Sequence, residues 1–264
     1  MKTIKRYQIA NIVSFIGVIT ANFLANYLPL NGYNTGELSD MYPNLFVPAG
    51  ITFSIWGVIY LFLLGFIIYQ SKGLINNLNK SPGFVMKIGW LFFISSIANI
   101  AWIFAWHHLM VFVSLIFMLI LLISLIGIYL RLDIGKNNFT GVKKILVNIP
   151  FSLYLGWITI ATIANITAWL VSINWSGWGL SEVTWTIIIL IVGVLITILN
   201  TLKRTDSIYA LVVIWAYAGI IIKRYQAEPR YMSIVLTAVI GILVILINIF
   251  YAKWKNKKRK KINF

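Results

Sequence analysis

Long hydrophobic stretches alternate with short polar connections along the whole chain. Each stretch has about the length of a bilayer-spanning helix, which needs roughly 20 apolar residues. The stretches contain no acidic or basic side chain, and they predict eight membrane-spanning helices, at residues 8–28, 48–70, 88–106, 109–130, 145–172, 183–202, 207–222 and 232–252. The pattern therefore predicts an all-α integral membrane protein that forms a single membrane domain over residues 1–264.

Three of the predicted helices have features that bear on their assignment. The first is too long for the apolar region of a signal peptide, and Asn22, Asn26 and Tyr27 stand where a cleavage site needs small residues. We therefore interpret it as a membrane helix. The pair His107 and His108 separates the third span from the fourth at an interface. The seventh span is the shortest, at 16 residues, and a re-entrant segment is the alternative there.

Basic residues are divided very unequally between the two sides that eight spans define. Nineteen Lys and Arg residues lie on the side of the termini, and only Lys223, Arg224 and Arg230 lie on the other side. Because cytoplasmic loops are enriched in Lys and Arg, this asymmetry predicts that both termini are in the cytoplasm and that the protein lies in the cell membrane. It also favours an even number of spans, since an odd number would move the basic C-terminus outside.

The composition agrees with a membrane protein and excludes several other classes. Hydrophobic residues make up 60% of the 264 residues, charged residues make up 11%, and the mean hydropathy is +0.89. These values exclude a soluble enzyme, a disordered chain and a collagen-like fibre. The chain has no cysteine, which excludes disulfides, thiolate metal sites and a cysteine nucleophile.

The net charge is +16, and its densest part is the C-terminal segment 253–264. In a soluble protein such a run would indicate a nucleic-acid partner. Here the run directly follows a membrane span. We therefore interpret it as a basic cytoplasmic tail that contacts anionic lipid headgroups, and we expect no nucleic-acid partner.

The predicted spans hold few groups that could carry out chemistry. No Lys and none of the six acidic residues lies inside a span, Asp206 for example being placed in a cytoplasmic connection. Ion-coupled transporters and pumps usually have ionisable groups there. His107 and His108 point about 100° apart on a helix, so a polar pair at the helix end is favoured over a haem or metal ligand. No metalloprotease, nucleophile-elbow, phosphate-binding or dinucleotide motif occurs. We therefore predict no catalytic residue and no metal site.

The informative groups inside the spans are neutral. In the fifth span Trp157, Ala161, Asn165 and Trp169 recur at every fourth residue, so they form one slowly turning stripe with a small residue between large aromatic ones. Such a notch can hold a flat apolar ligand, with Trp rings as walls and Asn amides to orient it. Helix packing is the alternative, because small residues and Asn are common at membrane helix interfaces.

Three segments together carry the spacings of one known family. They read Asn99-x-x-Trp102-x-x-x-Trp106 in the third span, Trp157-x-x-x-Ala161-Thr162-x-x-Asn165-x-x-x-Trp169 in the fifth, and Pro48 followed by Trp56 and Tyr60 at the start of the second. These segments resemble the signatures of the tryptophan-rich sensory protein family, also called the translocator protein or peripheral benzodiazepine receptor family (TspO/MBR). The order of the three segments agrees with that family as well.

The resemblance covers only part of the chain and is not complete. A single Pro48 stands where the family has two prolines. No basic residue follows Asn165 until Lys203, so the family's aromatic-then-basic cholesterol motif is missing and sterol binding is in doubt. The resemblance implies a five-helix unit over residues 8–172, and residues 183–252 would add three transmembrane helices. We interpret the chain as an extended, divergent relative.

The resemblance implies a ligand pocket under the first loop. The family binds porphyrins, haem-like tetrapyrroles and other apolar ligands, so a tetrapyrrole would be a ligand here rather than a cofactor. Carried over residue by residue, the pocket would comprise Trp56, Asn99, Trp102, Ala161, Thr162, Asn165 and Trp169. The implied function is that of a non-enzymatic sensor-like or regulator-like binder. A small-molecule transporter and a porphyrin-degrading enzyme are the alternatives, and a homodimer is left open.

Overall fold

The computed structural model describes residues 2–28, 30–75, 83–137 and 139–262, and no strand occurs in those ranges. Seven helices have the length and hydropathy of a membrane span, and α5, with 17 residues, is a shorter apolar helix. The chain is thus an all-α integral membrane protein, and the eight long helices lie where the hydrophobic pattern predicts them. They are α1 (Lys2–Tyr27), α3 (Ile55–Ile75), α5 (Leu91–His107), α6 (Val111–Arg131), α8 (Ile149–Ser172), α9 (Glu182–Arg204), α10 (Ser207–Gln226) and α11 (Met232–Ile262).

Short helical segments fill several of the connections. The connection from α1 to α3 contains η1 (Leu30–Gly32), α2 (Thr35–Asp40) and η2 (Gly50–Ser54). The remaining short segments are α4 (Gly83–Ile88), α7 (Gly141–Lys143), the π-helical η3 (Lys144–Asn148) and η4 (Gly177–Gly179). A capping box at Asn34 and Glu37 fixes the start of α2. The Asn34 side chain accepts a hydrogen bond from the Glu37 backbone N–H, and the Glu37 side chain accepts one from the Asn34 backbone N–H.

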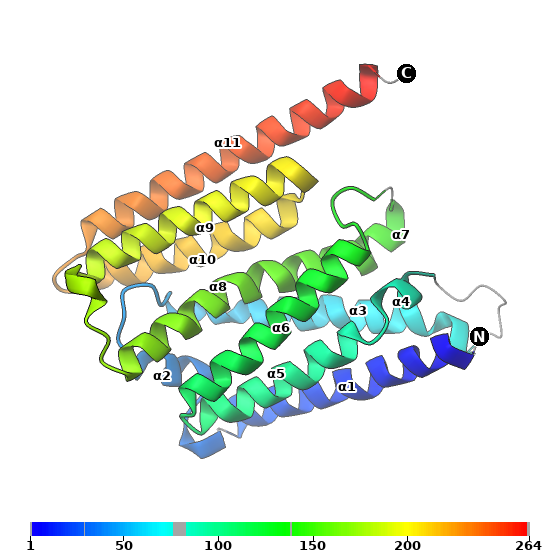
Figure 1. Cartoon of the computed structure of the whole chain (residues 1–264), viewed down its shortest axis with the longest axis horizontal. Helices are drawn as coiled ribbons and strands as arrows, with labels where there is room; N and C mark the ends of the chain where they lie inside the picture. Colours follow the sequence, from blue (N-terminus) through cyan, green and yellow to red (C-terminus); the bar gives the residue numbers. More distant parts are fainter. Residues whose placement is uncertain (1, 29, 76–82, 138, 263–264) are drawn as a thin grey trace.

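The contacts of the first five long helices form a closed ring, and Figure 1 shows these helices on one side of α9, α10 and α11. α1 contacts α3 and α5, α5 contacts α6, α6 contacts α8, and α8 returns to α3. Inside the ring, Phe66 packs edge-on against Phe151 with ring centroids 5.0 Å apart, and Phe92 lies 5.4 Å from Phe66. α10 packs against α8, and α9 and α11 pack against α10 and each other. The fold is therefore a five-helix bundle with three further helices attached along α8.

Close approaches between the last three helices depend on glycine. The Tyr217 ring of α10 is fully buried, and its hydroxyl donates to the Leu190 carbonyl of α9 at 2.5 Å. A Cβ added at Gly193 would overlap that hydroxyl, and one added at Gly241 would lie 3.2 Å from the ring. The absence of side chains at these two positions therefore makes room for Tyr217 between α9 and α11.

Asp206 has a different environment from the one that the sequence pattern indicates. Its side chain is buried at the N-terminus of α10 rather than lying in an open connection. One carboxylate oxygen accepts hydrogen bonds from Tyr129 of α6 at 2.8 Å and from Ser152 of α8 at 2.7 Å. The other caps the backbone N–H groups of Ile208 and Tyr209. One carboxylate thus joins α6, α8 and α10, which hydropathy alone could not indicate.

The prediction that the seventh span is the shortest is wrong. α10 is continuous over 20 residues, with the length and hydropathy of a membrane span, and α5 is the shortest of the eight long helices. The two basic residues that ended the predicted span, Lys223 and Arg224, belong to the last turn of α10. Lys223 forms an ion pair with Asp40, and the buried Arg224 lies with its guanidinium 5.9 Å from the Tyr231 ring. Long basic side chains can lie along a helix while their charged groups reach polar partners.

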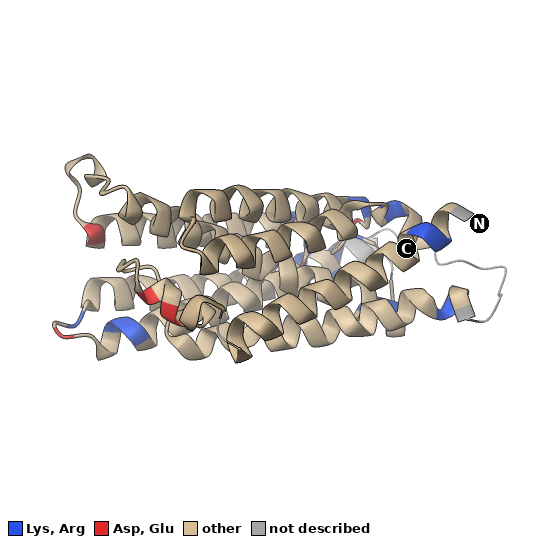
Figure 2. Ribbon diagram, turned by 90° about the horizontal axis from the view of Figure 1, so that it is seen from below, with Lys and Arg blue, Asp and Glu red and all other residues tan. Residues whose placement is uncertain are grey.

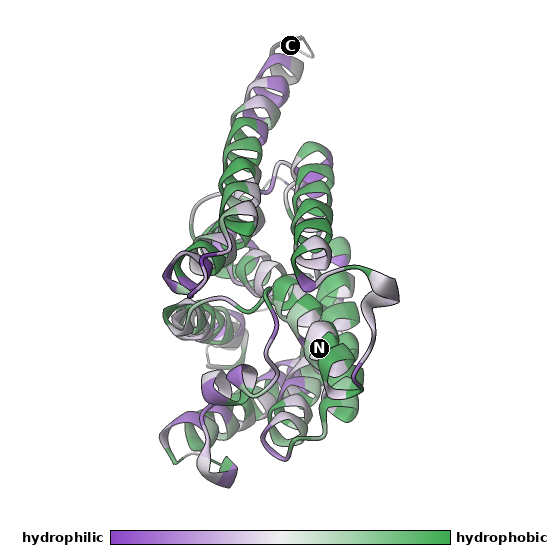
Figure 3. Cartoon of the chain, turned by 90° about the vertical axis from the view of Figure 1, so that its left-hand side faces the viewer, coloured by the Kyte–Doolittle hydropathy of each residue, from purple (hydrophilic) through white to green (hydrophobic). Residues whose placement is uncertain are grey.

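The basic segment at the C-terminus continues α11 as a helix as far as Ile262. Figure 3 shows the hydrophobic part of α11 giving way to hydrophilic residues toward the C-terminus. Residues 263–264 of the predicted tail, and Lys80 among the predicted cytoplasmic residues, lie outside the described residues. Figure 2 shows both termini at the same end of the bundle, with most Lys and Arg positions near that end. This arrangement is what an even number of crossings requires.

Reporter fusions test the predicted orientation. A fusion at the C-terminus and one after Ser176 should report opposite sides of the membrane, because α9, α10 and α11 separate the two positions. The asymmetry of basic residues predicts that the C-terminal fusion is active in the cytoplasm. Activity of the C-terminal fusion only outside the cytoplasm would contradict this orientation.

Candidate ligand-binding site

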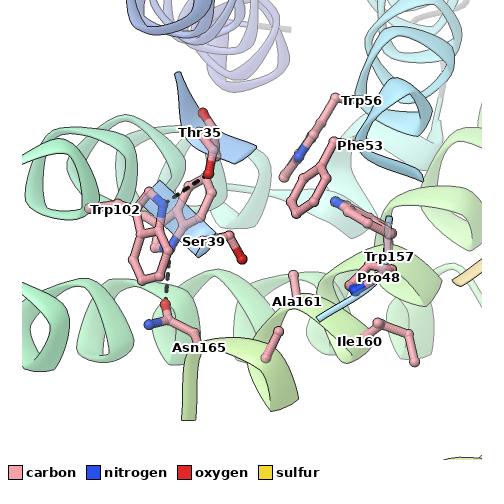
Figure 4. A pocket seen from close by; sticks show the side chains of 12 residues that line it. Thr35, Ser39, Pro48, Phe53, Trp56, Trp102, Trp157, Ile160, Ala161 and Asn165 are labelled. Atoms are coloured by element: carbon pink, nitrogen blue, oxygen red, sulfur yellow. Dashed lines mark hydrogen bonds between the residues drawn. The ribbon is translucent and has the colours of Figure 1, made fainter. Parts of the chain in front are cut away.

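A small pocket lies inside the five-helix ring, beneath the connection between α1 and α3 (Figure 4). Side chains of α3, α5 and α8 line it together with residues of that connection. The lining residues are Thr35, Ser39, Pro48, Phe53, Trp56, Trp102, Trp106, Trp157, Ile160, Ala161, Ala164 and Asn165. None of them carries a formal charge, so the pocket is suited to an apolar or neutral polar group.

Four indole rings form most of the pocket wall. Trp56 and Trp102 stack with centroids 6.0 Å apart and an interplanar angle of 29°. Trp102 in turn stacks on Trp106 at 6.4 Å, because the two residues are one helical turn apart on α5. Trp157 meets Trp56 edge-on at 6.1 Å. Stacked and edge-on rings at these distances stabilise one another, so the wall is an ordered aromatic cluster.

The α8 side of the pocket comes from the stripe that the sequence pattern identifies. Trp157, Ala161 and Asn165 line the pocket from one face of the helix, and Ala164 and Ile160 lie beside them. Ala161 leaves an open space between Trp157 and Asn165, as the notch in the sequence predicts (Figure 4). Any larger side chain at position 161 would extend into this space.

Hydrogen bonds fix two of the tryptophan rings. The Trp102 indole N–H donates to the Asn165 side-chain oxygen at 3.0 Å, and Asn165 in turn donates to Ser114 at 3.1 Å. The Trp106 indole N–H donates to the Thr35 carbonyl at 3.4 Å. These bonds join α5 to α6, α8 and the connection above the pocket. The amide of Asn165 therefore holds the wall in place.

One residue that lines the pocket carries a buried donor without a partner. The Trp157 side chain is 2% exposed, and its indole N–H has no hydrogen-bond partner among the described residues. An unpaired buried donor is costly, by about 1–3 kcal/mol. A ligand that carried a carbonyl or carboxylate oxygen near this ring would satisfy it.

Three of the seven predicted site residues lie outside the pocket. Asn99 accepts from Asn22 of α1 at 2.9 Å and donates to Tyr154 of α8 at 3.1 Å, so its amide joins three helices. The Thr162 hydroxyl donates to a backbone carbonyl of its own helix. Trp169 packs against Phe112 with centroids 5.5 Å apart. The structure thus brings together Trp56, Trp102, Ala161 and Asn165 and leaves out Asn99, Thr162 and Trp169.

The different surroundings of the two asparagines lead to a testable difference. Asn99→Leu removes two interhelical hydrogen bonds of about 0.6 kcal/mol each, so we expect lower stability with unchanged ligand affinity. Asn165→Leu also frees the Trp102 ring, so we expect both stability and affinity to fall. Melting temperature and affinity for a porphyrin should be measured on the same preparations. A loss of affinity in Asn99→Leu at unchanged stability would contradict this assignment.

His107 fixes the connection above the pocket rather than presenting a free ligand atom. It is fully buried, and Nδ1 lies 3.1 Å from the Leu30 carbonyl, which can only accept, so we infer that Nδ1 carries the proton. Nε2, 3.3 Å from the Thr35 hydroxyl, then accepts from it. His108 is exposed. Among the described residues no cluster of His, Cys, Asp and Glu could hold a metal ion.

Two larger cavities lie next to the pocket. The pocket itself has a volume of about 40 Å³, enough for a few waters only. A cavity of about 270 Å³ lies between α1 and α3, and one of about 350 Å³ lies toward α2. Trp56 and Thr35 line all three spaces. Ligand sites usually measure roughly 300–1,000 Å³, so the pocket alone is too small for a large planar ligand unless Trp56 moves and joins it to the neighbouring cavities.

Several pocket residues were missed by sequence reasoning. Trp157 belongs to the stripe recognised in the sequence but is missing from the pocket residues that the family resemblance implies. Thr35 and Ser39 gave no such signal, because they lie in a connection whose path depends on contacts with distant helices. The other residues not predicted are Pro48, Phe53, Trp106, Ile160 and Ala164.

Comparison with known proteins gives one match. A protein-family model described as TSPO-like protein matches residues 8–251. The matched region extends beyond residue 172, so it includes α9 and α10 and most of α11. No curated protein and no solved structure matches the chain.

Proposed function

Because the chain belongs to the TSPO-like protein family, we propose that it binds a planar, largely apolar ligand of the tetrapyrrole class in the tryptophan-lined pocket. In this proposal the protein is a sensor or regulator in the membrane rather than a catalyst. The observation that carries the proposal is the unused indole N–H of Trp157 among stacked indole rings. Such a site offers flat apolar contact and one hydrogen bond, which suits an aromatic ligand with an oxygen at its edge.

Trp56 is the residue that admits the ligand in this proposal. Its side chain lines the pocket and both larger cavities, and it is only half-buried. Rotation of the ring would open one continuous space between α1, α3 and α8. The ligand would then displace the stack between Trp56 and Trp102 and form its own stacking contacts with these rings.

Replacing Ala161 by Leu tests the pocket directly. The larger side chain fills the notch, and overpacking of a tight site costs about 1–3 kcal/mol, so protoporphyrin should bind roughly 5- to 150-fold more weakly. Gly57→Leu is the matched control, because it adds the same side chain on α3 where no atom lies within 4 Å of an added Cβ. Equal protoporphyrin affinity in Ala161→Leu, Gly57→Leu and the unmodified protein would show that the notch serves packing alone.

Transport is the second candidate function. The cavities on two sides of Trp56 favour it, because one opens toward α2 and the other lies between α1 and α3. Purified protein in liposomes separates the two candidates. Saturable protoporphyrin binding without flux across the bilayer favours a sensor, and flux that Ala161→Leu abolishes favours a transporter.

A further inference from the structure

The segment above the pocket, residues 35–54, is called here the roof segment. It supplies Thr35, Ser39, Pro48 and Phe53 to the pocket lining. Its regular structure consists of α2, with six residues, and η2, with five. Isolated helices shorter than roughly 12–15 residues are marginal in water. Contacts with longer helices must therefore hold the roof segment in place.

Two long helices, α5 and α10, hold the roof segment. The first half contacts α5 of the ring, through the hydrogen bonds of Trp106 and His107 to Thr35. The second half contacts α10, which lies outside the ring. Two α10 residues make these contacts, Trp215 and Gly219, and Lys223, four residues further along the same face, pairs with Asp40 at the end of α2 in the first half.

Two hydrogen bonds join α10 to the middle of the roof segment. The Trp215 indole N–H donates to the Thr52 carbonyl at 3.0 Å. The Ala49 backbone N–H donates to the Gly219 carbonyl, also at 3.0 Å. Both bonds reach backbone groups next to Pro48 and Phe53, the two pocket residues of this half. Their loss would free the backbone that positions these side chains.

Gly219 allows this close approach. A Cβ at position 219 would overlap the Thr52 hydroxyl and lie 3.0 Å from the Pro48 side chain. Thr52 is 1% exposed, so it has no free space into which to move. The third contact, the Lys223–Asp40 ion pair, lies at the outer end of α10 with half-exposed side chains. Exposed ion pairs contribute little, so the first two contacts dominate.

We propose that α10 positions the roof of the ligand pocket, so that the C-terminal helices set how readily a ligand enters and leaves. Trp215, Gly219 and Lys223 are positioning residues, since they act through Thr52, Ala49 and Asp40 and do not line the pocket. The proposal rests on the proposed function only for its ligand measurement. The contacts themselves exist whatever the pocket binds.

Thiol labelling tests this proposal. The chain has no cysteine, so a single introduced cysteine carries the only thiol that can react. Ser39→Cys places a thiol in the roof segment, where the native side chain is 9% exposed and lines the pocket. Its reaction rate with a water-soluble maleimide measures how often the roof opens. Ser124→Cys, at a buried position of α6, reports opening of the bundle as a whole.

In the Ser39→Cys background, Trp215→Phe keeps an aromatic ring and removes the N–H donor. We expect labelling about 2- to 10-fold faster, the factor that corresponds to one net hydrogen bond. Gly219→Leu should accelerate labelling more than Trp215→Phe does, because the added side chain pushes the roof segment away from α10. Trp254→Phe on the exposed face of α11 is the matched control and should leave the labelling rate unchanged. Labelling at control rates in both α10 variants, or equal acceleration at Ser124→Cys, would overturn the proposal.

The ligand measurement uses the cysteine-free chain. Protoporphyrin should dissociate about 2- to 10-fold faster from Trp215→Phe than from Trp254→Phe. Unchanged dissociation would overturn the role of α10 in ligand exchange. If the unmodified chain binds no protoporphyrin, the proposed function fails, and the labelling rates still decide whether α10 positions the roof.

Discussion

Replacing Asp206 by Ala should destabilise the protein by about 2–4 kcal/mol. The substitution removes the cap of α10, which is worth about 1 kcal/mol. It also leaves the Ser152 hydroxyl without its acceptor, whereas the Tyr129 hydroxyl keeps a second acceptor, the Asn200 side-chain oxygen at 3.3 Å. Each buried group left unpaired costs about 1–3 kcal/mol. The free energy of unfolding, from denaturant titration in detergent micelles, is the measurement.

Asp133→Asn is the matched control for this substitution. Asp133 lies at the same end of the bundle and forms an ion pair with Arg204. The Asp133 side chain is half-exposed in this pair. Exposed pairs contribute about 0–1 kcal/mol, and Asn tolerates the left-handed backbone of this position. We therefore expect a loss below about 1 kcal/mol. Equal losses in the two variants would show that the buried carboxylate does not join the helices as described.

Gly193→Ala should cost about 2–3 kcal/mol, although one methyl group is a small addition. The new Cβ overlaps the Tyr217 hydroxyl, and the buried ring has Gly241 on its other side, so it cannot move away. Overpacking of this kind typically costs about 1–3 kcal/mol, and displacement of the hydroxyl would also break its bond to Leu190. Denaturant titration in the same micelles measures the loss.

A second substitution distinguishes this overlap from a general effect of alanine. Tyr217→Phe removes the hydroxyl that the new Cβ meets, so Gly193→Ala should cost less in that background than in the native one. Gly57→Ala adds the same methyl group to α3 in open space and should leave stability unchanged or raise it. A full loss that persists in the Tyr217→Phe background, with the Tyr217→Phe change alone neutral, would rule out the overlap.

The helices of this protein are easy to predict because the bilayer fixes their length. A spanning helix must be long and apolar over its whole length, so hydropathy alone places all eight. Hydropathy ended the seventh span too early, at the charged Lys223. The ion pair of Lys223 with Asp40 joins residues far apart in the sequence. Hydropathy along the chain contains no information about such a partner.

Without the family resemblance, which supplied Trp56 and Trp102, the pocket could be predicted only where its residues share one helix. Trp157, Ala161 and Asn165 stand at regular spacing on α8, so their common face is visible in the sequence. Asn99 and Asn165 look equivalent in the sequence, yet only Asn165 reaches the pocket. The difference arises because the Asn99 side chain is bound by Asn22 and Tyr154 from two other helices. Which neighbours a buried amide finds depends on tertiary packing.

α8 belongs to the ring and also contacts α10, which bears on the order of assembly during synthesis. All five ring helices precede α9 in the chain, so the ribosome completes them first. The ring can therefore close while the α10-facing side of α8, which includes Gly156, still contacts lipid. When α10 arrives, Val212 packs against Gly156, where an added Cβ would lie only 3.0 Å away. A glycine there lets a late helix dock without reopening a bundle that has already formed.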